Sequence, residues 1–199
     1  MWEARYADAG GYLFGEEPAQ MLVENPWVTG GATTCLCVAD GEGRNGVWLA
    51  RQGLSVTSFD LSPTAVERAQ ALATKAGVRI NTNVSDWDGW DWTQSFDLVV
   101  AIFVQFMGPE ERVRQFETLR GAVRPGGRLV LHGYTPEQIE FGTGGPPYPE
   151  NMYTPELLSD AFGDWRILRL AAYEREVQEG RGHSGHSALI DLVAEKPVA

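Results

Sequence analysis

The stretch T-C-L-C-V-A-D-G-E-G-R-N, residues 34–45, decides the fold. Its first half, 35–39, is a short apolar run of the kind found in strands buried on both faces of a parallel sheet. Its second half is an acidic turn with glycines, and the helical pattern that follows stops at Gly53. A second apolar run, 54–59, then ends on Asp60. Strand, glycine turn, helix and strand predict the opening βαβ unit of a nucleotide-binding sheet.

The glycine turn matches the pattern G-x-G-x-x-G, which alone is a weak signal. It is compatible with NAD, with S-adenosyl-L-methionine (SAM), or with a plain tight turn. Asp40 and Glu42 flank the glycines and would repel the pyrophosphate of a dinucleotide, which prefers bare N–H groups. SAM carries a sulfonium and an ammonium instead, so charge favours SAM. Asp60 is then expected to accept the ribose hydroxyls.

Composition sets further bounds. The chain has 199 residues, 43% of them hydrophobic, which is one domain's worth of sequence with a substantial core. Cys35 and Cys37 point to one face of the first strand and are expected to be buried, reduced thiols, with no metal site. No secretory signal and no apolar run of ~20 residues is present, which predicts a cytoplasmic protein without membrane contact. The formal net charge of −11 disfavours a nucleic-acid partner. Composition leaves the oligomeric state open, and a monomer is compatible with it.

Alternating strand and helix signals continue along the chain, which predicts a mostly parallel sheet covered on both faces. Near the C-terminus two strand patterns are joined by a link too short for a crossover helix, so they must pair as an antiparallel hairpin. The expected later strands are 78–83, 96–104, 128–134, 165–177 and 187–194, and the expected helices are 63–76, 109–123 and 155–162.

Two aromatic-rich segments have open interpretations. Residues 1–25 contain Trp2, Tyr6, Tyr12 and Phe14, and form either a cap on the sheet or a lid over a cofactor. The acidic loop 84–92 follows the third strand. There Asp86 is expected to accept from an adenine amino group beside a covering ring, the adjacent Trp87, whereas Trp90 and Trp92 are expected to be packing anchors.

These segments together resemble class I SAM-dependent methyltransferases, and more narrowly the small bacterial enzymes grouped with tellurite-resistance and thiopurine methyltransferases. The resemblance covers nearly the whole chain. It implies a Rossmann-like, seven-stranded, mostly parallel α/β sheet whose last strand is antiparallel, SAM as cofactor, and 1–199 as one methyltransferase domain with 1–25 as its lid or cap. The motifs that carry it are Arg5-Tyr6, Tyr12-x-Phe14-Gly15, Gly41 to Asn45, Asp60-Leu61-Ser62-Pro63, Arg124 to Gly127, Tyr134 to Gln138 and Phe141 to Pro147.

The chain departs from the family at two positions. Cys37 stands where the family usually has an acidic residue, and Ala39 where it has a glycine. Asp40 is then expected to supply a displaced carboxylate for the methionine ammonium. The positions implied to bind the cofactor are Ala39, Asp40, Gly41, Glu42, Gly43, Arg44, Asn45, Asp60, Leu61, Asp86, Trp87, Ala101 and Phe103.

The methyl acceptor is expected at the carboxyl ends of the fourth and fifth strands. The segment Phe103-Val104-Gln105-Phe106 lacks an amine-methylating Asn-Pro-Pro-Tyr motif and suits a small, soft acceptor, a thiol or a chalcogen compound. His132 is expected to be a core residue, whereas His183 and His186 are placed in an exposed turn, as solvated residues or as proton acceptors. The candidate catalytic residues are His183, Tyr12, Gln105 and Tyr134.

Two other functions stay open at this point. A non-catalytic module that binds SAM would keep the same cofactor residues. An NAD-linked oxidoreductase would need a second nucleotide half or a catalytic domain, for which 199 residues leave little room.

Overall fold

Seven strands form one sheet in the order β3-β2-β1-β4-β5-β7-β6, in a computed structural model that describes residues 2–198. The first five strands pair in parallel, and β7 pairs antiparallel with both β5 and β6. This confirms the predicted mostly parallel sheet with a C-terminal antiparallel hairpin. The strands are β1 (Thr34–Val38), β2 (Ser55–Asp60), β3 (Asn81–Val84), β4 (Phe96–Ile102), β5 (Val123–Tyr134), β6 (Arg166–Glu179) and β7 (His183–Glu195).

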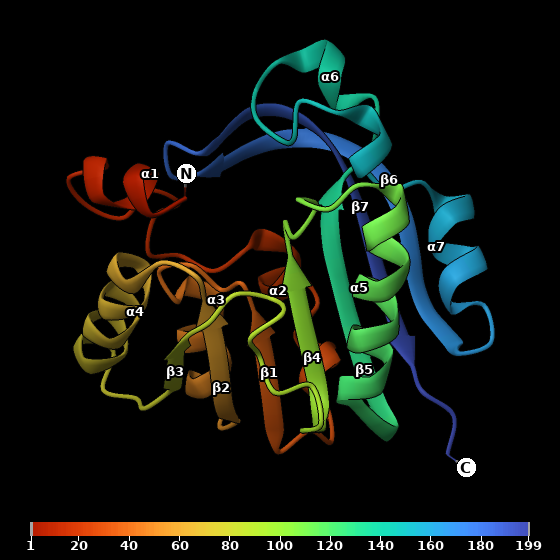
Figure 1. Cartoon of the computed structure of the whole chain (residues 1–199), viewed down its shortest axis with the longest axis horizontal. Coiled ribbons are helices and arrows are strands. Elements are labelled where there is room, and N and C mark those ends of the chain that lie inside the picture. Colours follow the sequence, from red (N-terminus) through yellow and green to blue (C-terminus); the bar gives the residue numbers. More distant parts are fainter. Residues whose placement is uncertain (1, 199) are drawn as a thin grey trace.

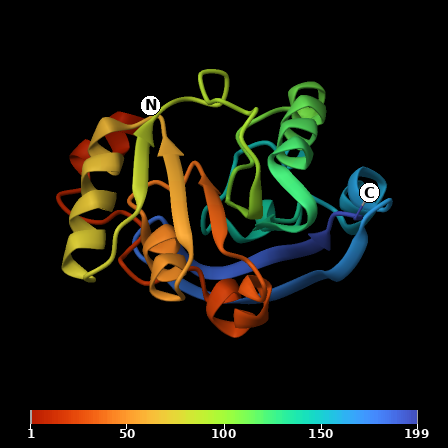
Figure 2. The same cartoon turned by 90° about the horizontal axis from the view of Figure 1, so that it is seen from below.

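Helices cover both faces of this sheet (Figures 1 and 2), α5 on one face and α2 and α3 on the other. Two of the helices begin with a side-chain N-cap. Ser62 accepts from the Ala65 amide at the start of α4, and Thr154 accepts from the Leu157 amide at the start of α7. The helical elements are α1 (Trp2–Asp8), α2 (Gln20–Glu24), η1 (Pro26–Thr29), α3 (Arg44–Arg51), α4 (Pro63–Lys75), α5 (Pro109–Ala122), α6 (Gln138–Phe141), η2 (Pro149–Asn151) and α7 (Pro155–Phe162).

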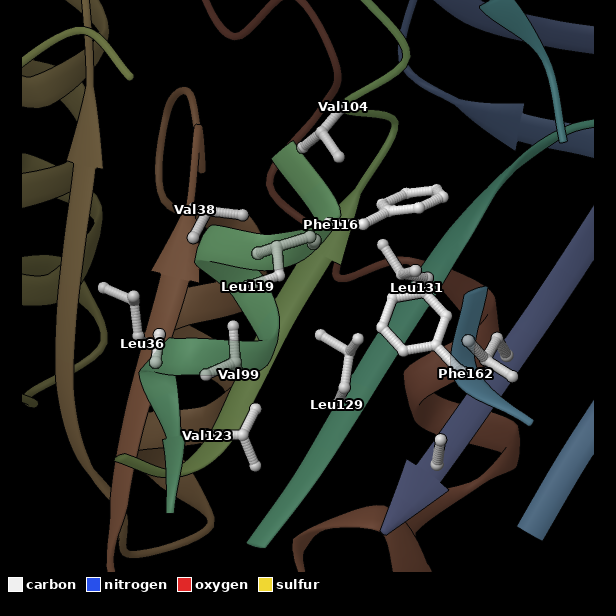
Figure 3. Packing of buried hydrophobic residues seen from close by; sticks show 14 of the residues in the cluster. Leu36, Val38, Val99, Val104, Phe116, Leu119, Val123, Leu129, Leu131 and Phe162 are labelled. Atoms are coloured by element: carbon white, nitrogen blue, oxygen red, sulfur yellow. The ribbon is translucent and has the colours of Figure 1, made fainter. Parts of the chain in front are cut away.

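The hydrophobic core lies in two layers, one on each face of the sheet. Strand β5 shows the alternation, since Leu129 and Leu131 belong to the layer under α5 and α7, whereas Val130 belongs to the opposite layer. Figure 3 shows Phe116 and Leu119 of α5 packed over the sheet in the first layer. Because both faces are covered, the central strands need apolar residues at consecutive positions, which explains their continuous apolar runs.

The C-terminal hairpin is longer than predicted. Its strands extend over Arg166–Glu179 and His183–Glu195 instead of 165–177 and 187–194, which leaves only residues 180–182 for the turn. The extra length arches over the carboxyl ends of the parallel strands and reaches the N-terminal segment (Figure 1). The amides of Arg181 and Gly182 donate to the Leu13 carbonyl oxygen at 3.0 and 3.2 Å. The sequence did not reveal this arch because Gly180, Gly182 and Gly185 are residues typical of turns and weaken the strand pattern there.

The other differences are small. Helices α1 and α6 were not predicted, and β3 begins at Asn81 instead of residue 78. Helix α1 is rich in aromatic residues and α6 has only four residues, so neither shows a clear helical period. Over residues 2–198 no helix has the length and apolar character that a membrane crossing requires.

Candidate functional site

The carboxyl ends of β1 and β4 mark the point where the sheet reverses its winding. Strand β1 pairs in parallel with β2 on one side and with β4 on the other. Open α/β sheets bind ligands at such a switch point. Ala39 and Phe103 follow these two strands with φ angles of 48° and 57°, and are the non-glycine residues of positive φ within 2–198. Each costs about 1–2 kcal/mol of backbone strain, a feature that clusters at functional sites.

Two glycines shape the turn after β1 for different reasons. A Cβ at Gly43, which has a φ of 84°, would lie 2.6 Å from Ala69 Cβ, so this glycine lets the turn pack against α4. A Cβ at Gly41, which has a φ of 58°, would lie 2.6 Å from the Tyr6 hydroxyl oxygen. Gly41 therefore allows a group to approach the turn from the crevice side, and the N-terminal segment places Tyr6 there.

Asp60 closes the same corner from β2. Its Oδ2 accepts the Gly41 amide at 2.9 Å and its Oδ1 accepts the Ser62 amide at 3.0 Å. Burial raises the pKa of this carboxyl group, against the effect of both hydrogen bonds. A carboxylate oxygen has two acceptor positions, so each oxygen can accept one further hydroxyl. The adjacent Leu61 is 48% exposed and offers an apolar surface beside the carboxylate.

Asp40 lies below the turn and faces α3. Its Oδ2 accepts the Gly46 amide at 3.1 Å, within the first turn of α3. Burial raises the pKa of Asp40 to about 7, opposed by this hydrogen bond and by Arg44. Cys35 and Cys37, the two thiols on β1, are free and buried with their sulfur atoms 4.0 Å apart, as predicted.

The remaining side chains of the turn hold neighbouring segments. Glu42 accepts the Leu13 amide and the Arg68 guanidinium, both at 2.7 Å. Arg44 pairs with Glu179 of the hairpin at 2.7 Å, and Asn45 accepts the Ala19 amide at 2.9 Å. Among the residues implied to bind the cofactor, these three contribute contacts that place the N-terminal segment and the hairpin over the crevice.

The N-terminal segment is tied down at several points. Glu3 of α1 accepts the hydroxyls of Ser62 and Thr64 at 2.5 Å, at the start of α4. Tyr12 donates to the Arg68 carbonyl at 3.2 Å and packs on α3 and α4 next to Val47. These contacts hold the segment against the two helices that follow β1 and β2.

Aromatic rings gather at the carboxyl ends of β4 and β5. The His183 imidazole is stacked between Phe14 and Phe103, with centroids at 4.5 and 4.1 Å. Its Nδ1 lies 2.6 Å from the Tyr134 hydroxyl. Burial holds the pKa of His183 well below its usual range, with a further contribution from Arg44, so the ring is neutral. The expectation of an exposed turn is wrong for His183, which is buried because the arch carries it inward.

Gln105 fixes the backbone at this wall. Its Oε1 accepts the Tyr134 amide at 2.7 Å and its Nε2 donates to the Tyr134 carbonyl at 2.8 Å. Gly133 has no side chain, and a Cβ there would collide with the Gln105 amide. Of the four candidate catalytic residues, the structure thus brings Gln105, Tyr134 and His183 together and leaves Tyr12 apart.

The other predicted positions are more dispersed. Asp86 is exposed and accepts the Gly89 amide at 2.7 Å, whereas Trp87 is buried and donates to Thr118 at 3.1 Å. Ala101 is fully buried in β4. His186 is exposed and pairs with Glu174 at 2.9 Å. Of the two anchors, Trp90 stacks on Phe59 and Trp92 donates to the Trp87 carbonyl.

Sequence reasoning missed three acidic residues that organise the region. Glu3 and Glu179 hold the N-terminal segment and the hairpin, and Asp191 lies fully buried opposite His132. The only signal for Asp191 was an acidic residue inside the apolar run 188–194. Nothing in the sequence pairs Glu3 with α4 or Glu179 with Arg44, because these contacts join distant segments.

Comparison with known proteins finds a similarity to methyltransferases. Residues 35–127 match the family model described as a methyltransferase domain. The chain is 30% identical over 103 residues to an uncharacterized protein of Mycobacterium tuberculosis, a match that spans 51% of this chain and 37% of the relative. The chain thus spans little more than a third of the length of the curated relative.

Solved structures share the fold. TehB from Haemophilus influenzae has a TM-score of 0.71 at 18% identity, over 89% of this chain and 62% of TehB. A protein studied for the conversion of a disulfide bond into a thioacetal group during echinomycin biosynthesis has a TM-score of 0.77 at 20% identity, over 98% and 90%. The N-methyltransferase NodS from Bradyrhizobium japonicum, in complex with S-adenosyl-L-homocysteine, has a TM-score of 0.68 at 14% identity, over 89% and 85%.

The chain thus has the Rossmann-like fold of these solved structures, and residues 35–127 are similar to a methyltransferase domain. The NodS structure in this set holds S-adenosyl-L-homocysteine, the product that SAM leaves after it gives up its methyl group.

Proposed function

We propose that this chain binds SAM in the β1–β2 half of the crevice and transfers its methyl group to a small acceptor held in the β4–β5 half. The observation that carries the proposal is the division of the crevice. The carboxylates and glycine turn lie on one side of the switch point, and a neutral aromatic wall lies on the other.

The residues of the first half fit SAM. Asp60 keeps acceptor positions for two ribose hydroxyls after binding the Gly41 and Ser62 amides. Leu61 offers an exposed apolar face for the adenine. Asp40 places a carboxyl group near the turn where the cationic methionine end would lie, and a neighbouring cation favours its ionised form. We further propose Asp86 as the acceptor for the adenine amino group.

SAM supplies an electrophilic methyl group on a sulfonium, and the chain's residues orient the partner. Gln105 fixes the position of Tyr134 through its backbone, and Tyr134 in turn holds His183. Phe14 and Phe103 keep the imidazole in one plane and exclude water. Alignment of this kind can lower a barrier by several kcal/mol, up to about 7–11.

The acceptor proposed for this wall is a small thiol or chalcogen compound. Burial raises the pKa of Tyr134, and His183 is neutral, so the wall carries no formal charge. A polarizable nucleophile that ionises near neutral pH gains from such a wall, whereas nucleic acid would be repelled by the net charge of −11. The small size of the acceptor and the absence of nucleic acid are parts of this proposal.

The cofactor half is tested by calorimetry with SAM. Asp60→Ala removes a charged acceptor, which is worth about 1.5–3 kcal/mol, so SAM binding should weaken about tenfold or more. The apo protein should also lose stability, since two buried amides lose their acceptor. Asp88→Ala, at an exposed ion pair with Arg114, is the matched control and should leave affinity unchanged. Equal affinity of the Asp60 variant and the parent would refute the placement of the cofactor.

The acceptor is tested with methyl-labelled SAM and a panel of small alkyl thiols, aromatic thiols, selenite and tellurite. Labelled product from a member of the panel would support the transferase. Tight SAM binding without transfer to any compound would favour the second candidate function, a SAM-binding module. The substitutions of Cys37 and Ala39 for the family's residues are the observation behind that alternative.

A further inference from the structure

A buried polar network lies next to the aromatic wall, between β5, β6 and β7. His132 and Asp191 face each other across the antiparallel pair of β5 and β7, with Nδ1 and Oδ1 2.7 Å apart. The second oxygen of Asp191 accepts Arg169 Nε at 2.8 Å, and the Tyr173 hydroxyl donates to Oδ1 at 3.1 Å. Asp191 is fully buried and His132 is 2% exposed.

Such a network needs a reason other than stability. Replacing a buried ion pair by apolar residues is often neutral or stabilising, because removal of the charges from water costs several kcal/mol. The neighbouring positions Leu131 and Leu192 show that both strands accept apolar residues fully buried in the core. We therefore interpret the buried carboxylate of Asp191 as a group that fixes the orientation of the three side chains that donate to it.

The second ring nitrogen of His132, Nε2, takes no part in this network. With Asp191 accepting at Nδ1, the neutral ring carries its proton there and presents a lone pair at Nε2. Within residues 2–198 the structure shows no hydrogen bond to that Nε2. A carboxylate that holds one imidazole nitrogen while the other stays free is the orientation found in general bases.

His132 adjoins the acceptor half of the crevice. Its carbonyl accepts the Phe103 amide at 2.8 Å, and its ring lies 4.8 Å from the Phe103 ring, edge to face. The Phe103 ring also stacks on the His183 imidazole, with centroids 4.1 Å apart. Phe103, a strained residue with a φ of 57°, therefore contacts both imidazoles.

We propose that His132, oriented by Asp191, accepts the proton of the methyl acceptor, and that the acceptor displaces the Phe103 ring to reach it. The inference rests on the proposed function and assigns its base. A thiol S–H would give its proton to Nε2 of His132 and keep the electron pair. The sulfur then forms a bond to the methyl carbon as the carbon–sulfonium bond breaks, which leaves a thioether and S-adenosyl-L-homocysteine. The imidazolium returns its proton to water.

The charges favour His132 over His183 as this base. An imidazolium at His132 would face the carboxylate of Asp191, which stabilises it. An imidazolium at His183 would lie between two phenyl rings, close to Arg44. The other charged or titratable groups around His132 are Arg169 and Tyr173 of β6, His183 itself, and the Glu24–Arg175 pair that joins α2 to β6.

The test compares two thiols of different acidity as acceptors. An alkyl thiol has a pKa near 8.5, as cysteine does, and needs a base at neutral pH, whereas an aryl thiol with an electron-withdrawing substituent is already ionised. His132→Gln and Asp191→Asn should lose about 10²–10⁴-fold in kcat/KM with the alkyl thiol and little with the aryl thiol. Asp164→Asn, at an exposed ion pair with Arg120, is the matched control and should change neither. Equal losses with both thiols would overturn the assignment.

A spectroscopic measurement on the parent protein tests the proposal even if the His132 and Asp191 variants fail to fold. In the parent protein with ¹⁵N-labelled histidine, the His132 ring should be the Nδ1–H tautomer with an unprotonated Nε2. An Nε2–H tautomer would overturn the proposal without any measure of activity. If the parent methylates neither thiol, the acceptor class of the proposed function fails, and the tautomer still decides whether His132 is poised to accept a proton.

Discussion

The hydroxyl oxygen of Tyr134 and Nδ1 of His183 lie 2.6 Å apart, which joins the end of β5 to the beginning of β7. The two residues are 49 positions apart in sequence and meet because the hairpin arches over the parallel strands. Both are buried. Loss of either partner leaves a buried polar group unsatisfied, which gives this contact consequences for the acceptor wall.

His183→Ala should lower kcat/KM by about five- to 150-fold while SAM affinity stays unchanged. An unsatisfied buried hydroxyl costs roughly 1–3 kcal/mol. We expect this cost to affect the methyl acceptor, because the Tyr134 hydroxyl lies where the acceptor is proposed to bind. Tyr134→Phe serves as the partner variant. The double variant should lose less than the sum of the single losses, since the contact is shared. Additive losses would show that the two side chains act independently.

The same imidazole should make stability depend on pH. The pKa of His183 is lowered in the fold, so the unfolded chain takes up its proton first, near pH 6.5. The stability that the fold gains by keeping His183 neutral is complete above pH 6.5 and is lost as the pH falls below 6.5. Urea unfolding of the parent from pH 7.5 to 5 should show this decline, and His183→Phe should reduce it. A parallel decline in the variant would assign the effect to other groups.

SAM binding should release protons near pH 7. The pKa of Asp40 is raised to about 7 by burial, so about half of the molecules carry a proton there at pH 7. A cationic ligand close to the turn favours the carboxylate and expels that proton. Calorimetry in two buffers of different ionisation enthalpy measures the release, and Asp40→Asn should abolish it. Unchanged release in the variant would place the cation elsewhere.

Ala39→Gly should stabilise the protein by about 0.5–1 kcal/mol. The substitution relieves about 1–2 kcal/mol of left-handed strain at a φ of 48° and costs about 0.4–1 kcal/mol of backbone entropy. Ala50→Gly, within α3, lacks such strain and should cost about 1 kcal/mol. Urea denaturation midpoints give both values. Destabilisation by Ala39→Gly would mean that the alanine side chain contributes packing that outweighs the strain.

Gly43→Ala should destabilise the apo protein, in addition to any loss of SAM binding. The added Cβ would lie 2.6 Å from Ala69 Cβ and 2.9 Å from its Cα, and overpacking of this kind costs about 1–3 kcal/mol beyond the strain. Gly53→Ala is the control, because its φ is also positive, 93°, and no atom lies within 4 Å of the added Cβ. If both variants lose the same free energy of unfolding, Gly43 is needed only for its backbone conformation and not for its packing against Ala69.

The placement of the glycine turn beside Asp60 could be predicted because both directly follow neighbouring strands in the chain. The glycine turn comes directly after β1, and Asp60 ends β2. Parallel strands bring their carboxyl ends to one edge, so the pattern itself places these groups together. The caps at Ser62 and Thr154 are likewise local, since each acts within one helical turn.

The surroundings of His183 were harder to predict for a physical reason. Tyr134, Gln105, Tyr12 and His183 were all named as candidate catalytic residues, yet His183 was expected in an exposed turn, and Tyr12 lies apart from the other three. The position of His183 depends on how far the hairpin extends and on which segment it meets. Both are decided by contacts between the turn and Leu13, across more than 160 residues of chain.

By itself the sequence determined the alternation of strands and helices, the antiparallel hairpin and the acidic, glycine-containing corner, since local periodicity and turn chemistry encode these features. Only the tertiary structure decided that Ala39 and Phe103 are strained and that Glu3 joins the N-terminal segment to Ser62. It also decided that His132 faces a buried Asp191. These features depend on pairs of residues far apart in the chain, and their energies arise from burial and contact that exist only once the sheet has formed.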